Sequence, residues 1–140
     1  MNAHDVDIYV FMKDGVFVYD YRNHELTPVR SGDFRSAVIM QRPPRPAAPE
    51  GPAPPPPSEP PIQIVLISDS DRFRAGADEV KYEWGAIDTG IISQNISLFC
   101  AATGLKTRPR ASMDKERIGE ILELKESQHV FLNHPVGYAK

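Results

Sequence analysis

The chain has 140 residues, which is enough for one ordinary domain and too few for two. Its formal net charge of -3 argues against a protein that binds nucleic acid by neutralising phosphates with clustered Lys and Arg. The single cysteine, Cys100, excludes an internal disulfide, and no cysteine or histidine spacing indicates a metal site. The apolar runs are too short to span a membrane and the first residues do not form a signal peptide, so we expect a cytoplasmic protein.

Proline is the unusual component of the composition, with 14 residues against a norm of roughly 5%. Most of these prolines lie within residues 42–61. Because proline removes backbone donors and fixes φ, this segment is predicted to be a linker or an exposed loop, with polyproline II as its regular form. The remaining residues, 1–41 and 62–140, have ordinary globular composition and are predicted to form the two parts of one domain.

The first residues predict antiparallel strands. Residues 6–12 and 16–19 are rich in β-branched and aromatic side chains, and Asp14-Gly15 between them is a hairpin turn signal. A second turn leads into residues 25–29, where Pro28 predicts a strand at the edge of a sheet.

Two further elements flank the proline-rich segment. Residues 32–40 predict a short helix capped by Asp33, because only about two turns of chain precede the prolines. Residues 62–67 are continuously apolar and β-branched, which is typical of a central strand covered on both faces. The polar residues 68–72 are expected to leave that strand as a loop.

In residues 85–103 the apolar side chains recur with the period of a helix. The apolar residues on and beside one face of this helix are Ile87, Ile91, Ile92, Ile96, Leu98, Phe99, Cys100 and Ala102. So broad an apolar face predicts a helix buried on most sides, with Cys100 as an inert core thiol. Gly104 is placed to end the helix, and residues 105–109 predict a short extended run.

The end of the chain predicts a second helix and a last strand. Residues 113–124 have helical periodicity, with Ser112 or Asp114 as the cap. The residues expected to face inward are Ile118, Ile121 and Leu122. Residues 130–138 predict a strand that is broken near Pro135. Together the elements predict a mixed α+β sheet domain.

Residues 86–107 resemble the central helix and following turn of the nitroreductase family of FMN-dependent oxidoreductases. The residues that carry this resemblance are Gly90, Gln94, Asn95, Leu98, Ala101 and the run Gly104-Leu105-Lys106-Thr107. Residues 2–10 look like the end of the family's Pro-Ser-Ala-x-Asn-x-Gln segment, and residues 135–140 are similar to its closing Val-Gly-Tyr-Pro-Lys. Residues 15–35 are similar to the branch of thiazoline-oxidase-type dehydrogenases.

The resemblance implies a mainly antiparallel α+β sheet with flanking helices, bound FMN and a homodimer whose flavin lies between the subunits. NADH or NADPH would reduce the flavin, which would pass electrons to a nitro, quinone or azoline-type acceptor. Gln94 and Asn95 would belong to the dimer helix, although satisfied core amides are the other interpretation. No catalytic side chain is implied, because the flavin carries the hydride chemistry.

By the same resemblance, Asn2 would hydrogen-bond the flavin ring edge, and the backbone amides of Ala111 and Ser112 would approach the ring. Arg110 and Lys140 would bind the phosphate or the electron-rich edge of the ring. The alternatives are a frayed end at Asn2, a plain loop with a helix cap at 111–112, and solvated surface cations.

The chain also departs from the family pattern. It is expected to lack the N-terminal region whose Arg-Arg-Ser motif holds the FMN phosphate, which predicts an incomplete fold. A truncated, inactive member that acts as a structural or dimerisation module is therefore the second hypothesis. A third is an adaptor that presents the prolines at 54–57 to an aromatic groove.

Overall fold

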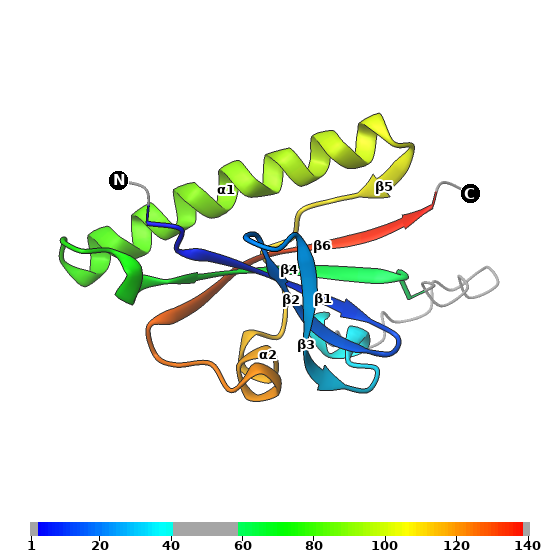
Figure 1. Cartoon of the computed structure of the whole chain (residues 1–140), viewed down its shortest axis with the longest axis horizontal. Coiled ribbons are helices and arrows are strands. Elements are labelled where there is room, and N and C mark those ends of the chain that lie inside the picture. The colour runs from blue at the N-terminus through cyan, green and yellow to red at the C-terminus, as the bar shows by residue number, and fades with distance from the viewer. Residues whose placement is uncertain (1–2, 41–58, 139–140) are drawn as a thin grey trace, which may run out of the picture.

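The computed structural model describes residues 3–40 and 59–138 as a six-stranded antiparallel sheet with helices on both faces (Figure 1). The strands are β1 (Val6–Met12), β2 (Gly15–Asp20), β3 (Glu25–Ser31), β4 (Ile62–Asp69), β5 (Leu105–Thr107) and β6 (Gln128–Tyr138). The helices are α1 (Asp78–Ala102) and α2 (Lys115–Leu122), with 3-10 turns η1 (Arg35–Val38) and η2 (Ser70–Arg72). The strand order is β3-β2-β1-β4-β6-β5, and the predicted α+β fold class is confirmed.

The predicted hairpin is confirmed. β1 and β2 pair from Tyr9↔Val18 to Met12↔Gly15, so the turn falls where the Asp-Gly signal predicts it. A Cβ on Gly15 would lie 2.7 Å from the carbonyl oxygen of Arg30, so only glycine allows β3 to approach this closely. β3, which contains Pro28, lies at the edge of the sheet and is exposed throughout, as predicted.

The short helix predicted at residues 32–40 is replaced by the 3-10 turn η1, and the predicted cap is wrong. Phe34 occupies the N-cap position and makes no side-chain cap bond. The Asp33 carboxylate instead accepts from Arg35, with 2.6 Å between Oδ2 and Nη2. Arg35 Nη1 also donates to the carbonyl oxygen of Pro60 at 3.2 Å, which joins the chain before the proline-rich segment to the end of that segment.

The predicted central strand is confirmed as β4, which lies between β1 and β6. Val65, Leu66 and Ile67 are completely buried because both faces of this strand are covered. The strand continues to Asp69, and η2 follows it in place of the predicted polar loop. The Asp69 side chain caps η2 by accepting from the backbone N–H of Asp71 at 3.1 Å.

Helix α1 begins at Asp78, earlier than predicted, and its predicted burial on most sides is wrong. Its buried residues are small or polar, namely Gly85, Thr89, Ser93 and Cys100. Ile87, Ile91, Leu98 and Phe99, which were predicted to be inside, are turned to solvent in the single chain, with Leu98 58% and Phe99 64% exposed. Ile92 and Ile96 are half-buried. Small residues face the sheet because α1 lies so close to β4 that a Cβ on Gly85 would overlap Ser68.

The ends of α1 and α2 follow the sequence signals. Gly104, with φ of +75°, lies just after α1 as predicted. Asp114, one of the two proposed caps, accepts from the backbone N–H of Arg117 at 3.0 Å and begins α2. Helix α2 is shorter than predicted because Glu123 adopts a left-handed conformation with φ of +53°.

The predicted break at Pro135 is absent, and β6 runs without interruption from residue 128 to 138. Alternate residues of a strand point their N–H groups to the same side, so the Pro135 nitrogen faces the same way as that of Asn133. On that side, β5 ends at Thr107, opposite Val136, and Asn133 pairs with Arg110. Pro135 lies at the gap between these two pairings, where no ladder bond is required.

The hydrophobic core lies between the sheet and the layer formed by η1 and α2. Its buried members are Phe11, Val16, Val38, Val65, Ile67, Met113, Ile118, Ile121 and Val130. Helix α1 covers the opposite face (Figure 1). Within residues 3–40 and 59–138, neither helix has the length and apolar character needed to cross a membrane.

Candidate functional site

The segment between β5 and α2 contains three of the predicted FMN-binding residues. It is held to β6 at Arg110, whose N–H donates to the carbonyl of Asn133 at 2.9 Å and whose carbonyl accepts from Asn133 at 2.8 Å. Arg110 is half-buried, and its Nε is buried without a hydrogen-bond partner in the described part of the chain. Ala111 and Ser112 are exposed, and neither backbone N–H donates to another described residue.

This segment therefore presents unused donors, namely the Arg110 guanidinium and two backbone amides, beside one another on the chain. Such a donor set suits an anionic group or the oxygen and nitrogen acceptors of a heterocyclic ring. The structure brings Arg110, Ala111 and Ser112 together by sequence proximity and by the bridge to β6. Asn2 and Lys140 lie outside the described residues, as does most of the proline-rich segment.

A second feature is a cavity of about 360 Å³ between the beginning of β1 and the middle of α1. It is lined by Ala3, His4, Asp5, Val6, Asp7, Ile8, Tyr19, Tyr21, Arg72, Asp88, Ile91 and Ile92. Ala3 follows Asn2 in the chain, whereas residues 110–112 are not part of this lining. No local sequence pattern indicates this cavity, because its walls come from β1, β2, η2 and α1, which are far apart in the chain.

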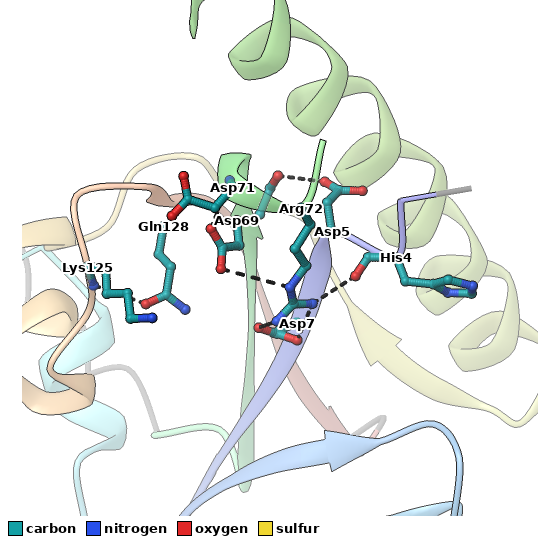
Figure 2. Close-up of polar contacts among 9 residues, drawn as sticks. His4, Asp5, Asp7, Asp69, Asp71, Arg72, Lys125 and Gln128 are labelled. Atoms are coloured by element: carbon teal, nitrogen blue, oxygen red, sulfur yellow. Dashed lines mark hydrogen bonds and ion pairs between the residues drawn. The ribbon is translucent and has the colours of Figure 1, made fainter. Parts of the chain in front are cut away.

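An ion-pair cluster around Arg72 borders the cavity (Figure 2). The guanidinium binds the Asp7 carboxylate through two bonds of 2.6 and 2.9 Å. It also donates to the carbonyl oxygen of His4 at 2.7 Å and lies 3.8 Å from the Asp69 carboxylate. Arg72 is therefore occupied by protein partners and joins the start of β1 to η2.

Asp5 is a buried carboxyl group at the same cavity. Its Oδ2 accepts from Ser68 Oγ at 2.6 Å, and no cation pairs with Asp5 among the described residues. Burial raises the pKa of Asp5 above its ordinary value, and the nearby Asp88 carboxyl raises this pKa further. Asp5 therefore keeps its proton at a higher pH than an ordinary aspartate.

On the α1 face of the sheet, His134 is completely buried in a hydroxyl cluster. Its Nε2 lies 2.8 Å from Ser93 Oγ of α1, and its Nδ1 lies 3.2 Å from Thr107 Oγ1 of β5. Burial lowers the pKa of His134 below its ordinary value. No group of three potential metal ligands occurs in the described ranges, and His134 serves to connect three elements.

The sequence matches the family model described as "Nitroreductase family" over residues 1–138. The chain belongs to the nitroreductase family. No curated protein matches the sequence. For the nitroreductase helix α1, the structure also excludes the interpretation of Gln94 and Asn95 as core amides, because both side chains are exposed.

Solved structures agree with the nitroreductase fold. A nitroreductase-type structure from Ralstonia eutropha is 21% identical with a TM-score of 0.75, and the match covers 96% of this chain and 58% of that one. The Escherichia coli microcin synthetase McbBCD complex with truncated pro-MccB17 is 14% identical with a TM-score of 0.78, covering 99% and 53%. A similar structure from Anabaena variabilis is 14% identical with a TM-score of 0.75, covering 97% and 27%. The chain thus spans little more than half of these relatives at most, and the likeness establishes the fold.

Proposed function

We propose that this nitroreductase-family chain belongs to a cytoplasmic, homodimeric, FMN-dependent oxidoreductase. Electrons would pass from NADH or NADPH to a nitro, quinone or azoline-type small molecule. The observation that supports this proposal is the family match over residues 1–138, combined with the unused donors of the 110–112 segment. FMN supplies hydride and electron transfer when it is bound.

The protein's own contribution is binding and orientation. Arg110 would hold the phosphate or an electron-rich edge of FMN, because its guanidinium has a buried Nε that is unpaired among residues 3–40 and 59–138. The exposed backbone amides of Ala111 and Ser112 would donate to ring acceptors, and small side chains leave them accessible. Asn2 and Lys140 complete the proposed set from the two ends of the chain.

The exposed apolar face of α1 supports a dimer. Ile87, Ile91, Leu98 and Phe99 are each more than half exposed in the single chain. Exposed apolar clusters of this kind are typical of protein interfaces. The homodimer would cover this face with the same helix of a second copy.

The test is an FMN titration of the purified full chain, followed by the quenching of flavin fluorescence. We expect saturable binding, and then flavin-dependent oxidation of NADH or NADPH with a quinone as the acceptor. Arg110→Met should weaken FMN binding by about tenfold, because a hydrogen bond to a charged group contributes ~1.5–3 kcal/mol. Arg117→Met, at an exposed position of α2, is the control.

A chain that takes up no FMN would contradict the proposal. A chain that binds FMN but oxidises neither nicotinamide would instead act as a structural or dimerisation module, which is the competing hypothesis.

A further inference from the structure

The cavity between the beginning of β1 and the middle of α1 has no part in the proposed contacts of residues 110–112, which do not line it. Its volume of about 360 Å³ lies toward the lower end of the range of small-molecule sites, ~300–1,000 Å³. The cavity is therefore large enough for a small organic ligand, and the chemistry of its lining indicates which kind.

The charged groups in the lining do not cancel. Three of them are carboxyl groups, on Asp5, Asp7 and Asp88, and one is the guanidinium of Arg72. Arg72 binds Asp7 through two hydrogen bonds, so these two charges neutralise each other (Figure 2). Asp5 and Asp88 pair with no cation within residues 3–40 and 59–138. The surplus of carboxyl groups disfavours phosphate and carboxylate ligands and favours a cation.

Asp5 and Asp88 form a pair of neighbouring carboxyl groups in the cavity wall. Asp5 is 2% exposed and accepts a hydrogen bond from Ser68 Oγ at 2.6 Å. The Asp88 carboxyl of α1 lies within hydrogen-bonding reach of Asp5. Burial raises the pKa of Asp5, and the second carboxyl raises it further. Such a pair is unfavourable when both groups are ionised, unless a cation binds between them.

The lining next to this pair is largely apolar. Ile91 and Ile92 follow Asp88 by three and four residues on α1, so all three lie on the same side of the helix. Val6 and Ile8 are two positions apart on β1 and share one face of the strand. A ligand with a positive group at the carboxyl pair would therefore have apolar side chains around the rest of it.

The edge of the cavity is fixed in the free protein. His4 adopts a left-handed backbone conformation with φ of +48°, and Arg72 holds its carbonyl oxygen at 2.7 Å. The His4 ring stacks on Tyr21, with 5.1 Å between the ring centroids. A wall that is already ordered lowers the entropic cost of binding a small ligand.

We propose that this cavity binds a small alkylammonium or arylammonium cation, with Asp5 and Asp88 as its counter-ions and the apolar lining around its hydrocarbon part. An ammonium group has three donors and no acceptor, which matches the acceptor-only oxygens of two carboxylates. The proton that the two carboxyl groups share in the free protein is released to solvent on binding. The inference involves no flavin and goes beyond the proposed function.

The first experiment titrates the purified full chain with benzylammonium and with benzyl alcohol, followed by the amide chemical shifts in NMR spectra. The two probes have similar shapes and differ in charge. We expect benzylammonium to saturate and to bind at least about tenfold more tightly than the alcohol, the effect of a hydrogen bond to a charged group. The shifts should occur at Ile8, Asp88 and Ile92, and not at Lys125, which lines a different cavity.

The second experiment uses Asp88→Asn, which removes the charge and keeps the shape of the side chain. We expect this variant to bind benzylammonium about tenfold more weakly and to bind benzyl alcohol as the wild type does. Its melting temperature should be equal or higher, because a neutral amide beside Asp5 removes the repulsion between the carboxyl groups. Glu83→Gln, at an exposed position of the same helix, is the control and should keep the preference for the ammonium probe.

Each other outcome has a definite meaning. Saturation with neither probe would show that the carboxyl groups only link β1 to α1 by sharing a proton, and would overturn the inference. Equal affinity for the two probes, shifts outside the cavity lining, or an unchanged preference in Asp88→Asn would overturn it too. FMN binding is measured separately, so a chain that binds benzylammonium but no FMN contradicts the proposed function alone, and the reverse result contradicts this inference alone.

Discussion

At the residue scale, two buried titratable groups set opposite responses of the fold to acid. His134 has a pKa lowered by burial, so below about pH 6.5 the unfolded chain takes up a proton that the folded chain resists. Folding stability therefore falls as the pH decreases from the unfolded pKa toward the folded one. Asp5 has a pKa raised by burial, so its folded form gains a proton first and stability rises as the pH falls through that pKa.

We predict that His134→Gln reduces the loss of stability between pH 7.5 and pH 5.5. Glutamine can still hydrogen-bond the hydroxyls of Ser93 and Thr107 but does not titrate. The difference between variant and wild type should reach at most about 1.4 kcal/mol over this range, since one proton changes stability by ~1.4 kcal/mol per pH unit and about one unit lies below the unfolded pKa. Urea unfolding at both pH values measures it, with His24→Asn at an exposed turn as the control. Parallel curves for wild type and His134→Gln would contradict the assignment.

At the element scale, α1 has an unusual distribution of side chains for a helix on a sheet. Its sheet-facing residues include Gly85, Thr89 and Ser93, and several of its large apolar residues, such as Leu98 and Phe99, face outward. This arrangement follows from the close approach of α1 to β4 at Ser68. The helix is anchored by contacts such as Ser93 with His134 rather than by interlocking large side chains.

We predict that Gly85→Ala destabilises the fold by about 1–3 kcal/mol, even though alanine favours helices, because the added methyl group overlaps Ser68. Gly119→Ala is the matched control in α2, where a Cβ meets nothing within 4 Å. That change should stabilise the fold by about 0.5–1 kcal/mol through helix propensity alone. Thermal unfolding of both variants gives the comparison, and a Gly85→Ala protein as stable as wild type would refute the close approach.

At the scale of the whole molecule, the two faces of the sheet have different characters. The η1/α2 face contains the single-chain core, which closes over Phe11, Val65 and Met113. The α1 face is covered by a helix whose outer surface exposes Ile87, Ile91, Leu98 and Phe99. Exposed apolar side chains are stabilised when a second protein surface covers them, and this is the physical basis of the proposed homodimer.

We predict that Leu98→Asp converts the dimer to monomers at micromolar concentration. Burying a leucine contributes ~1.5–3 kcal/mol and a buried unpaired carboxylate adds a penalty, so the dimer dissociation constant should rise at least about tenfold. Sedimentation equilibrium measures this change. Val29→Asp, on the exposed edge strand β3, should leave the association unchanged. A wild-type chain that stays monomeric at 100 μM would contradict the proposed dimer.

Local signals made much of the fold predictable. The Asp14-Gly15 turn, the apolar run of β4, the Asp114 cap and the glycine after α1 act within a few residues, so the sequence shows them directly. The break expected at Pro135 was wrong because the cost of a proline depends on whether a neighbouring strand needs its N–H.

The features of the candidate site also divide into those that the local sequence indicates and those that depend on the tertiary structure. By itself the sequence determined most of the strands, the two α-helices and the nitroreductase resemblance, because each depends on motifs of residues close together in the chain, whereas residues 110–112 remain a prediction from that resemblance. Only the tertiary structure decided which side of α1 is buried, that Asp5 meets Ser68, and that Val65, Asn133 and Arg110 form one row across the strands. A helical period reveals that two faces differ but not which one meets the sheet, and a row across strands exists only once their register is set.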